Sequence, residues 1–292
     1  MSAENKTENP QRHGRLSVVA TPIGNLEDIT LRALRTLREA DLILAEDTRR
    51  TMGLCRHHGV GTPLHSFHAH TPRSKIAGLI EKMREGAHVA IVSDAGTPLI
   101  SDPGAELVRA VIDAELEVQV IPGANAPITA LVASGLLSHR FEFIGFLPRS
   151  GGRRTRALEE LRRARGAVVL FEAPNRIGAT LRDLATTLGE LRQAAVCREL
   201  TKLHEEIARG SLSELAVRFA EGTLGEITLV IGAPDVPEED EIEPTPDEEI
   251  VSWLELEGLG TRDAATRLSE RHNIGRKEAY QRVLEISAQR KQ

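Results

Sequence analysis

Charged side chains gather in the segment EDTRRT, directly after the short apolar run 42–45. Carboxylates such as Glu46 and Asp47 can accept a proton or hold a cationic group, and the guanidinium groups of Arg49 and Arg50 can bind phosphate. The same residues at the same spacing can also pair with one another on the protein surface. The segment is therefore open to two interpretations, substrate binding and a surface ion-pair cluster.

Two further segments contain many residues that shape the backbone. The loop 93–104, SDAGTPLISDPG, combines Gly96 and Gly104, which adopt positive φ freely, with prolines that fix φ. The loop 122–126, PGANA, follows the next predicted strand. Such loops offer a ligand mainly main-chain groups, so we expect a cofactor held largely through backbone. A tight strand-to-helix connection without a ligand is the alternative.

Predicted strands place these loops at one edge of a sheet. The β-branched runs 89–92 and 118–121 lack a helical period and each stops at a cluster of Gly, Pro, Ser or Asp. Other elements expected in this half are strands at 16–20, 42–45 and 141–146, the last closing the sheet, and helices at 31–40, capped by Thr30, and 76–84. Small ligands bind at the carboxyl ends of the strands in an open parallel sheet, which makes these loops the candidate site.

The second half of the chain repeats the alternation and predicts another α/β unit. Strands are expected at 167–171, 194–197 and 227–231, and helices at 177–188 and 212–221. Between them lie the loops EAPNR (172–176) and RELTKLHEE (198–206), so Glu199 and Lys202 also follow a strand.

The sequence contains two clusters of basic residues, one of histidines and one of arginines. Histidines stand at 57, 58, 65, 68 and 70, but no Cys pair or acidic partner accompanies them at ligand spacing, so we predict no metal site. The segment 147–166 contains seven arginines, of which Arg149, Arg153, Arg154 and Arg156 lie in or beside a Gly-rich loop. That loop resembles a phosphate-binding patch, although a solvated helix face remains open.

Composition limits the class of protein. Hydrophobic residues make up 40% of the 292 residues and aromatic residues only 3%, which argues against RNA-binding modules that stack bases on a sheet. No apolar run approaches the ~18 residues needed to span a bilayer, and the first residues lack the apolar core of a signal peptide, so we expect a cytoplasmic protein. Cys55 and Cys197 are expected to be reduced.

Charge is distributed unevenly along the chain. The net charge is −6, yet without the nine acidic residues of 234–249 it would be +3. We therefore predict a disordered tail at 1–15, α/β domains at 16–148 and 149–233, and an acidic Pro-rich linker at 234–247. Three helical patterns at 248–292, separated by glycines, predict a helix-turn-helix-like segment.

A family resemblance rests on these segments taken together. VATPIGNLEDIT, AEDTRRT, SDAGTPLISDPG, PGANA, GFLPR, FEAPNR, CRELTK and GEITLVI occur in this order. They closely resemble the ribosomal RNA small subunit methyltransferase I family, within the tetrapyrrole methylase superfamily. The resemblance implies two α/β domains with S-adenosylmethionine in the cleft between them, a homodimer, and 2′-O-methylation of a cytidine in the decoding region of 16S rRNA.

The resemblance also implies residue roles. The cofactor contacts of the superfamily fall on Pro22, Ser93, Asp94, Ala95, Thr97, Pro98, Asn125, Ala126, Phe171 and Glu172. Candidates for the catalytic base or for phosphate contacts, which the sequence does not rank, are Glu46, Asp47, Arg49, Glu199 and Lys202. An interdomain salt-bridge network is the alternative for these five. The four arginines at 149–156 and the helical segment are the expected RNA contacts. FHAHTP departs from the family's FHEHN-like segment, and Asn175 stands where His is common.

Three other functions compete with this interpretation. A small-molecule tetrapyrrole methylase would share the fold and cofactor but needs neither the Arg-dense segment nor the helical tail. A dinucleotide oxidoreductase is disfavoured because no G-x-G-x-x-G follows the first strand. A non-enzymatic RNA-binding or ribosome-assembly protein would leave the two cofactor-like loops without a role.

Overall fold

The computed structural model describes residues 14–100, 102–234, 246–255, 258–272 and 274–289. The chain divides into two units, and the division falls between Pro234 and Asp235. Residues 1–13 of the predicted tail and residues 235–245 of the predicted linker lie outside the described residues. None of the described helices is long and apolar enough to cross a membrane.

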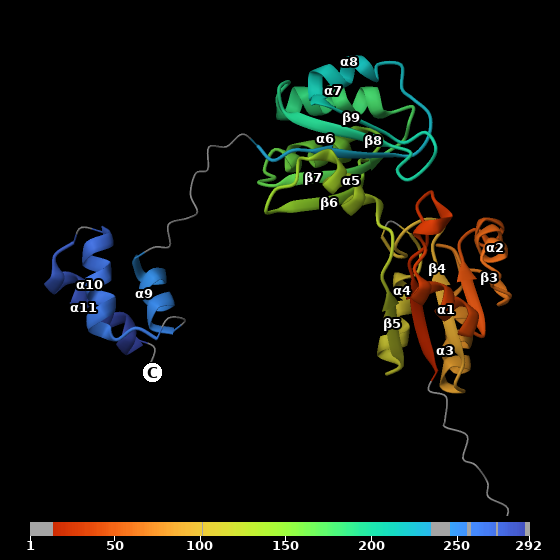
Figure 1. The fold of residues 1–292 in the computed structure, drawn as a ribbon, viewed down its shortest axis with the longest axis horizontal. Helices are drawn as coiled ribbons and strands as arrows, with labels where there is room; N and C mark the ends of the chain where they lie inside the picture. Colours follow the sequence, from red (N-terminus) through yellow and green to blue (C-terminus); the bar gives the residue numbers. More distant parts are fainter. Residues whose placement is uncertain (1–13, 101, 235–245, 256–257, 273, 290–292) are drawn as a thin grey trace, which may run out of the picture. The chain divides into compact units, whose positions relative to one another are not determined.

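The first sheet of the larger unit is parallel and has the strand order β3-β2-β4-β1-β5 (Figure 1). Its strands are β1 (Arg15–Val19), β2 (Leu42–Ala45), β3 (Leu64–Ser66), β4 (His88–Val92) and β5 (Glu117–Ile121). The sequence does not predict β3, because its three residues carry no apolar run. Since β1 lies between β4 and β5, the carboxyl ends of these three strands adjoin, and the loops after them meet.

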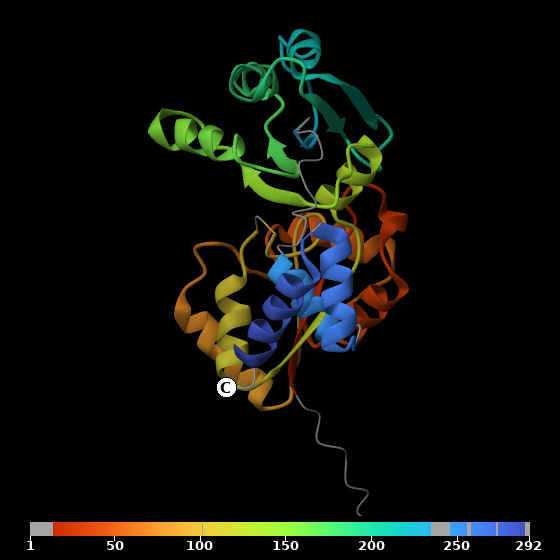
Figure 2. The ribbon, with the colours of Figure 1, turned by 90° about the vertical axis from the view of Figure 1, so that its left-hand side faces the viewer.

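Helices cover both faces of this sheet (Figure 2). They are α1 (Leu31–Glu39), α2 (Thr48–His57), α3 (Arg73–Arg84) and α4 (Ala105–Asp113), with a 3-10 turn at Leu26–Asp28. Side chains of α3 and α4 pack on the face that includes Leu44, and those of α1 and α2 pack on the face that includes Ile43. Because neighbouring strand residues point to opposite faces, β2 is apolar throughout. Thr30 caps α1 as predicted.

The second sheet is mixed and has the order β6-β7-β10-β8-β9. Its strands are β6 (Phe141–Phe146), β7 (Ala167–Glu172), β8 (Gln193–Arg198), β9 (Glu206–Ser211) and β10 (Ile227–Ile231). Only the β6–β7 pair is parallel; the other pairs are antiparallel. The sequence does not predict β9, because its polar residues form no apolar pattern.

The prediction that β6 closes the first sheet is wrong, and with it the boundary at residue 148. Helix α5 (Ala126–Ser134) explains the difference, because Ala130 and Leu131 pack against Val169 and Val230 of the second sheet. The chain has therefore left the first sheet before β6 begins. On the opposite face lie α6 (Gly151–Leu161), α7 (Ile177–Leu188) and α8 (Leu212–Arg218) (Figure 1).

The smaller unit consists of α9 (Pro246–Glu255), α10 (Thr261–His272) and α11 (Arg276–Gln289), as the three helical patterns predict. Trp253, Leu268 and Val283 lie in its core. The buried Glu249 carboxylate accepts from Arg271 at 2.8 Å and from His272 at 2.6 Å, so its charge is paired inside the unit.

Candidate cofactor site at the strand ends

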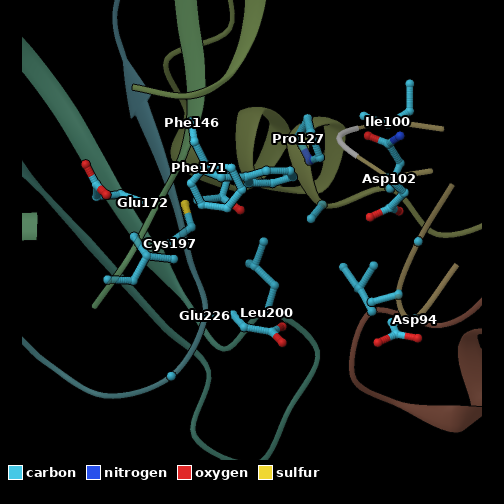
Figure 3. Close-up of a pocket in the computed structure, with 18 of the residues that line it drawn as sticks. Asp94, Ile100, Asp102, Pro127, Phe146, Phe171, Glu172, Cys197, Leu200 and Glu226 are labelled. Atoms are coloured by element: carbon cyan, nitrogen blue, oxygen red, sulfur yellow. The ribbon is translucent and has the colours of Figure 1, made fainter. Parts of the chain in front are cut away.

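A cavity of about 400 Å³ lies at the carboxyl edge of the first sheet, and the second sheet forms its other side. Figure 3 shows Phe146, Phe171 and Cys197 of the second sheet on one side, and Asp94, Ile100 and Asp102 of the loop after β4 on the other. The cavity falls within the ~300–1,000 Å³ of typical ligand sites.

Hydrogen bonds join the three loops that form the first-sheet side of the cavity. Thr21 and Gly96 exchange backbone hydrogen bonds of 2.9 and 3.0 Å, and Thr21 Oγ1 donates to the Ser93 carbonyl at 3.2 Å. The Asn125 amide donates to Thr97 Oγ1 at 3.3 Å and accepts from the backbone N–H of Ile128, which caps α5. These hydrogen bonds tie the loops after β1, β4 and β5 to one another.

Gly96 has φ of +78°, which a residue with a side chain rarely adopts, and an added Cβ would lie 3.2 Å from Ile23 Cγ2. The turn at this position therefore depends on glycine, as the sequence analysis expected of the loop. The first loop also approaches the loop after β8, because the backbone N–H of Asn25 donates to Thr201 Oγ1 at 3.0 Å.

Most of the predicted cofactor residues surround this space. Those that line the cavity are Asp94, Ala95, Thr97, Asn125, Ala126, Phe171 and Glu172. Pro22 and Ser93 line a second hollow of about 290 Å³, which shares Asp94, Ala95 and other residues with the first. Pro98 is buried and lines neither space.

The Glu172 carboxylate does not point into the cavity. Its neighbour Phe171 does, and adjacent strand residues face opposite sides of a sheet (Figure 3). Thr180 Oγ1 donates to Glu172 Oε2 at 2.5 Å, and Arg176 Nε lies 3.3 Å from Oε1. Cofactor binding by Glu172 therefore stays a prediction for its main chain alone, because its side chain points elsewhere.

Asp102 and Glu226 are titratable residues of the cavity that the sequence alone does not single out. Burial, followed by the charge of Glu46, raises the pKa of Asp102 to about 6. Burial and the nearby Asp94 also raise the pKa of Glu46, which is exposed and lines neither hollow. A carboxyl with a pKa near neutrality can accept a proton at physiological pH and release it again. The signal for Asp102 is present in SDPG, beside the Gly and Pro that shape the loop.

The catalytic candidates Asp47 and Arg49 have a structural role. Asp47 is the N-cap of α2, its Oδ1 accepts from the Arg49 backbone N–H at 2.9 Å, and its Oδ2 pairs with the Arg49 guanidinium at 2.9 Å. These hydrogen bonds hold the pKa of Asp47 at about 2, far below the range of a general base. The backbone N–H of Asp47 donates to Asp94 Oδ1 at 2.9 Å, which positions a cavity residue.

Glu199 and Lys202 belong to an ion-pair cluster. Lys202 Nζ donates to Glu199 Oε1 at 2.8 Å and to Glu226 Oε2 at 3.0 Å, and the Glu226 backbone N–H donates to Glu199. Burial lowers the pKa of Lys202, but these hydrogen bonds outweigh burial and leave it above its usual value. Lys202, which lines the second hollow, is therefore a cation at neutral pH and cannot be the base.

The Arg-dense segment is helical where a loop was expected, because α6 already begins at Gly151. Arg149, Arg153 and Arg156 are exposed. Arg154 is not: its side chain is 12% exposed and bonds Asp183 at 2.7 Å, Thr180 at 3.1 Å and the Pro148 carbonyl at 3.0 Å. Arg154 is therefore removed from the predicted RNA contacts, because its donors are already used inside the protein.

The remaining sequence candidates do not form a reactive centre. Within the described part of the chain, no group of three or more His, Cys, Asp or Glu side chains could hold a metal ion. Both cysteines are buried and free, and burial raises the pKa of the Cys197 thiol to about 11. Cys197 therefore contributes an uncharged wall to the cavity.

Comparisons with known proteins agree with this geometry. Residues 15–216 match the family described as Tetrapyrrole (Corrin/Porphyrin) Methylases. Proteins named Ribosomal RNA small subunit methyltransferase I include one from Halalkalibacterium halodurans, 42% identical over 96% of this chain and 98% of that protein. Another, from Synechocystis sp., is 45% identical over 94% of this chain and 99% of that protein.

Among solved structures, the fold resembles the uroporphyrin-III C-methyltransferase of Thermus thermophilus in complex with S-adenosylhomocysteine. The TM-score is 0.54, the sequence identity is 22%, and the match covers 75% of this chain and 97% of that one. This similarity concerns the fold alone. The family match and the curated relatives together show that the chain belongs to the tetrapyrrole methylases and, within them, to the ribosomal RNA small subunit methyltransferase I family.

Proposed function

We propose that the protein transfers a methyl group from S-adenosylmethionine to the ribose 2′-hydroxyl of a cytidine in the decoding region of 16S rRNA. The observation that carries the proposal is the cavity at the adjoining ends of β1, β4 and β5, with the second sheet forming its other side. Relatives more than 40% identical over nearly the whole chain carry the name of a small-subunit rRNA methyltransferase, which supports the substrate class.

The cavity residues fit this cofactor. When bound, S-adenosylmethionine supplies a methyl group activated by a sulfonium. Asp94 and Asp102 and the backbone carbonyls of the loop 93–97 offer negative charge and dipoles to such a cation. Phe171, Ile23 and Leu200 offer apolar surface to an adenosyl group. Pre-formed loops of this kind orient a bound group, and methyl transfer depends chiefly on orientation.

Asp102 is the carboxyl best suited to accept the proton of the ribose hydroxyl. It lines the cavity, and its pKa of about 6 leaves it mostly ionised at neutral pH while it remains a competent proton acceptor. Neither Asp47 nor Lys202 combines these properties. Lys202 Nζ already bonds the Glu199 and Glu226 carboxylates, so no contact with an RNA phosphate is assigned to it.

The exposed arginines Arg149, Arg153 and Arg156 lie on the segment that follows β6, which ends at the cavity residue Phe146. Guanidinium groups in that position can neutralise RNA phosphates next to the reacting nucleotide. The helical unit that begins at residue 246 is the second expected RNA contact.

A homodimer is part of the proposal. Val120, Ile128, Val132 and Leu137 are apolar side chains between 45% and 66% exposed, and all lie on β5, α5 and the segment after α5. Strand β5 is also an edge of the first sheet. An exposed apolar surface beside an open sheet edge is typical of a protein interface, and a second copy of this chain is the expected partner.

A direct test measures two properties of one preparation. Calorimetry is expected to show binding of S-adenosylhomocysteine, and a labelled methyl group is expected to move from S-adenosylmethionine to unmethylated 16S rRNA or small subunits. Uroporphyrinogen III serves as the competing acceptor. Methylation of the tetrapyrrole alone would replace the proposal by a small-molecule methylase, and absence of cofactor binding would leave an RNA-binding protein.

A further inference from the structure

Strand β6 contains an irregularity that turns one aromatic ring into the cavity. Its register with β7 shifts between Phe143 and Phe146, and Gly145 has φ of +67°. In a regular strand, residues three apart point to opposite faces of the sheet. The register shift cancels this alternation. As a result, the rings of Phe143 and Phe146 both contact Phe171, with centroid distances of 5.0 Å and 5.5 Å. A bulge therefore brings Phe146 to the cavity face, a use that bulges often have beside binding sites.

Phe146 remains largely uncovered in this position. Its side chain is 57% exposed although it lines the cavity, and Figure 3 shows the ring beside that of Phe171. The chain has only six phenylalanines. An apolar ring of this size gains little stability where water still reaches half of it, so its position calls for a ligand that covers the exposed part.

Partly buried arginines hold the chain directly after Phe146 in place. Arg176 donates to the Leu147 carbonyl at 3.0 Å, and Arg154 donates to the Pro148 carbonyl at 3.0 Å. These guanidinium groups are in turn fixed by Glu172 and Asp183. Phe146 is thus an exposed ring on a rigid support, and Arg149 follows three residues later as an exposed cation.

We propose that Phe146 is the stacking platform for the base of the nucleotide that is methylated, with Arg149 contacting an adjacent phosphate. An aromatic ring next to a guanidinium is the combination by which proteins hold unstacked bases of single-stranded RNA. This inference rests on the proposed function, because it assigns the ring to the RNA and not to the cofactor. The part of the substrate that the ring would hold is a base displaced from its neighbours.

Binding experiments test the ring without relying on turnover. The probes are a short fluorescent oligocytidylate and a ribose-phosphate oligomer of the same length without bases. Phe146→Ala is expected to weaken binding of the oligocytidylate roughly tenfold or more and to leave binding of the baseless oligomer unchanged. Phe146→Trp is expected to retain binding, whereas Phe146→Leu, which keeps an apolar side chain without an aromatic face, is expected to behave like Ala.

Two controls separate this inference from other roles of the ring. Phe141→Ala changes an exposed ring at the start of the same strand, outside the cavity, and should alter neither binding nor methylation. S-adenosylhomocysteine affinity should stay within about twofold of wild type in every Phe146 variant. If that affinity instead falls with the RNA affinity, the ring serves the cofactor and the inference is overturned.

Comparison of oligomer binding with rRNA methylation distinguishes the remaining outcomes. Equal losses for the oligocytidylate and the baseless oligomer in Phe146→Ala would also overturn the inference, because stacking requires a base. If the wild type binds oligocytidylate through Phe146 but methylates no rRNA, the proposed reaction fails while base stacking on Phe146 stands. If methylation proceeds normally in Phe146→Ala, the platform fails while the reaction stands.

Discussion

Thr180 makes the ionic cluster of Glu172, Arg176, Arg154 and Asp183 testable. Its hydroxyl donates to Glu172 Oε2 at 2.5 Å and accepts from Arg154 at 3.1 Å, and the residue is fully buried. Thr180→Val replaces the hydroxyl by a methyl group of similar size and leaves a carboxylate that is 3% exposed without one donor. A hydrogen bond to a charged group contributes ~1.5–3 kcal/mol. We therefore expect the free energy of unfolding of the larger unit to fall by about 2–3 kcal/mol.

Thr180→Ser is the matched control, because it keeps the hydroxyl and loses one buried methyl group at about 1 kcal/mol. Urea unfolding followed by circular dichroism measures both variants. With a urea m-value of ~2–3 kcal/mol/M, the midpoint of Thr180→Val should lie about 1 M below wild type, and that of Thr180→Ser should lie less than half as far below. A Val variant as stable as the Ser variant would show that Glu172 does not depend on this donor, and the rigid support ascribed to the cluster would be refuted.

Four further predictions concern the cavity and the Arg-dense segment. Ala126→Trp fills the cavity at the start of α5 and should abolish S-adenosylhomocysteine binding in calorimetry while circular dichroism stays unchanged; undiminished affinity would place the cofactor elsewhere. The single-turnover methylation rate should fall about tenfold per pH unit below pH 6, where Asp102 protonates, and Asp102→Asn should lower the plateau by ~10²–10⁴ and remove this dependence; a variant that retains the wild-type pH profile would exclude Asp102 as the base. Because folding raises the pKa of Asp102, its ionisation costs stability as the pH rises towards and above 6, so Asp102→Asn should be at least as stable as wild type at pH 8. Replacing Arg153 and Arg156 by Ala should flatten the slope of log K for RNA against log salt by about 1.5, with cofactor affinity unchanged, and an unaltered slope would show that these two side chains are only solvated.

The sequence predicts the strand-end loops well because their signals are local. Short apolar runs identify β1, β2, β4 and β5 to within a residue or two, and a parallel sheet brings their carboxyl ends together. The family motifs then name individual residues as candidates for cofactor contacts, and most of these candidates line the cavity. The three helices of the smaller unit follow equally from their local period.

Features that depend on packing could not be predicted from the local sequence. Nothing in its composition assigns β6 to the second sheet; that assignment depends on where α5 packs. The arginines at 153, 154 and 156 look alike in the sequence, but only Arg154 forms an ion pair with Asp183. The same limit applies to Phe146, because a low aromatic content says nothing about where a single exposed ring lies, and the bulge that turns it appears only in the register with β7.

The most direct test of the account is the identity of the methylated nucleoside. 16S rRNA without this modification is incubated with the protein and S-adenosylmethionine, a fragment spanning the decoding region is isolated, and its nucleosides are separated by mass spectrometry. The account predicts 2′-O-methylcytidine in that fragment with the wild-type protein and none with Ala126→Trp. A methyl group on a base, on another nucleoside or only outside the decoding region would contradict it.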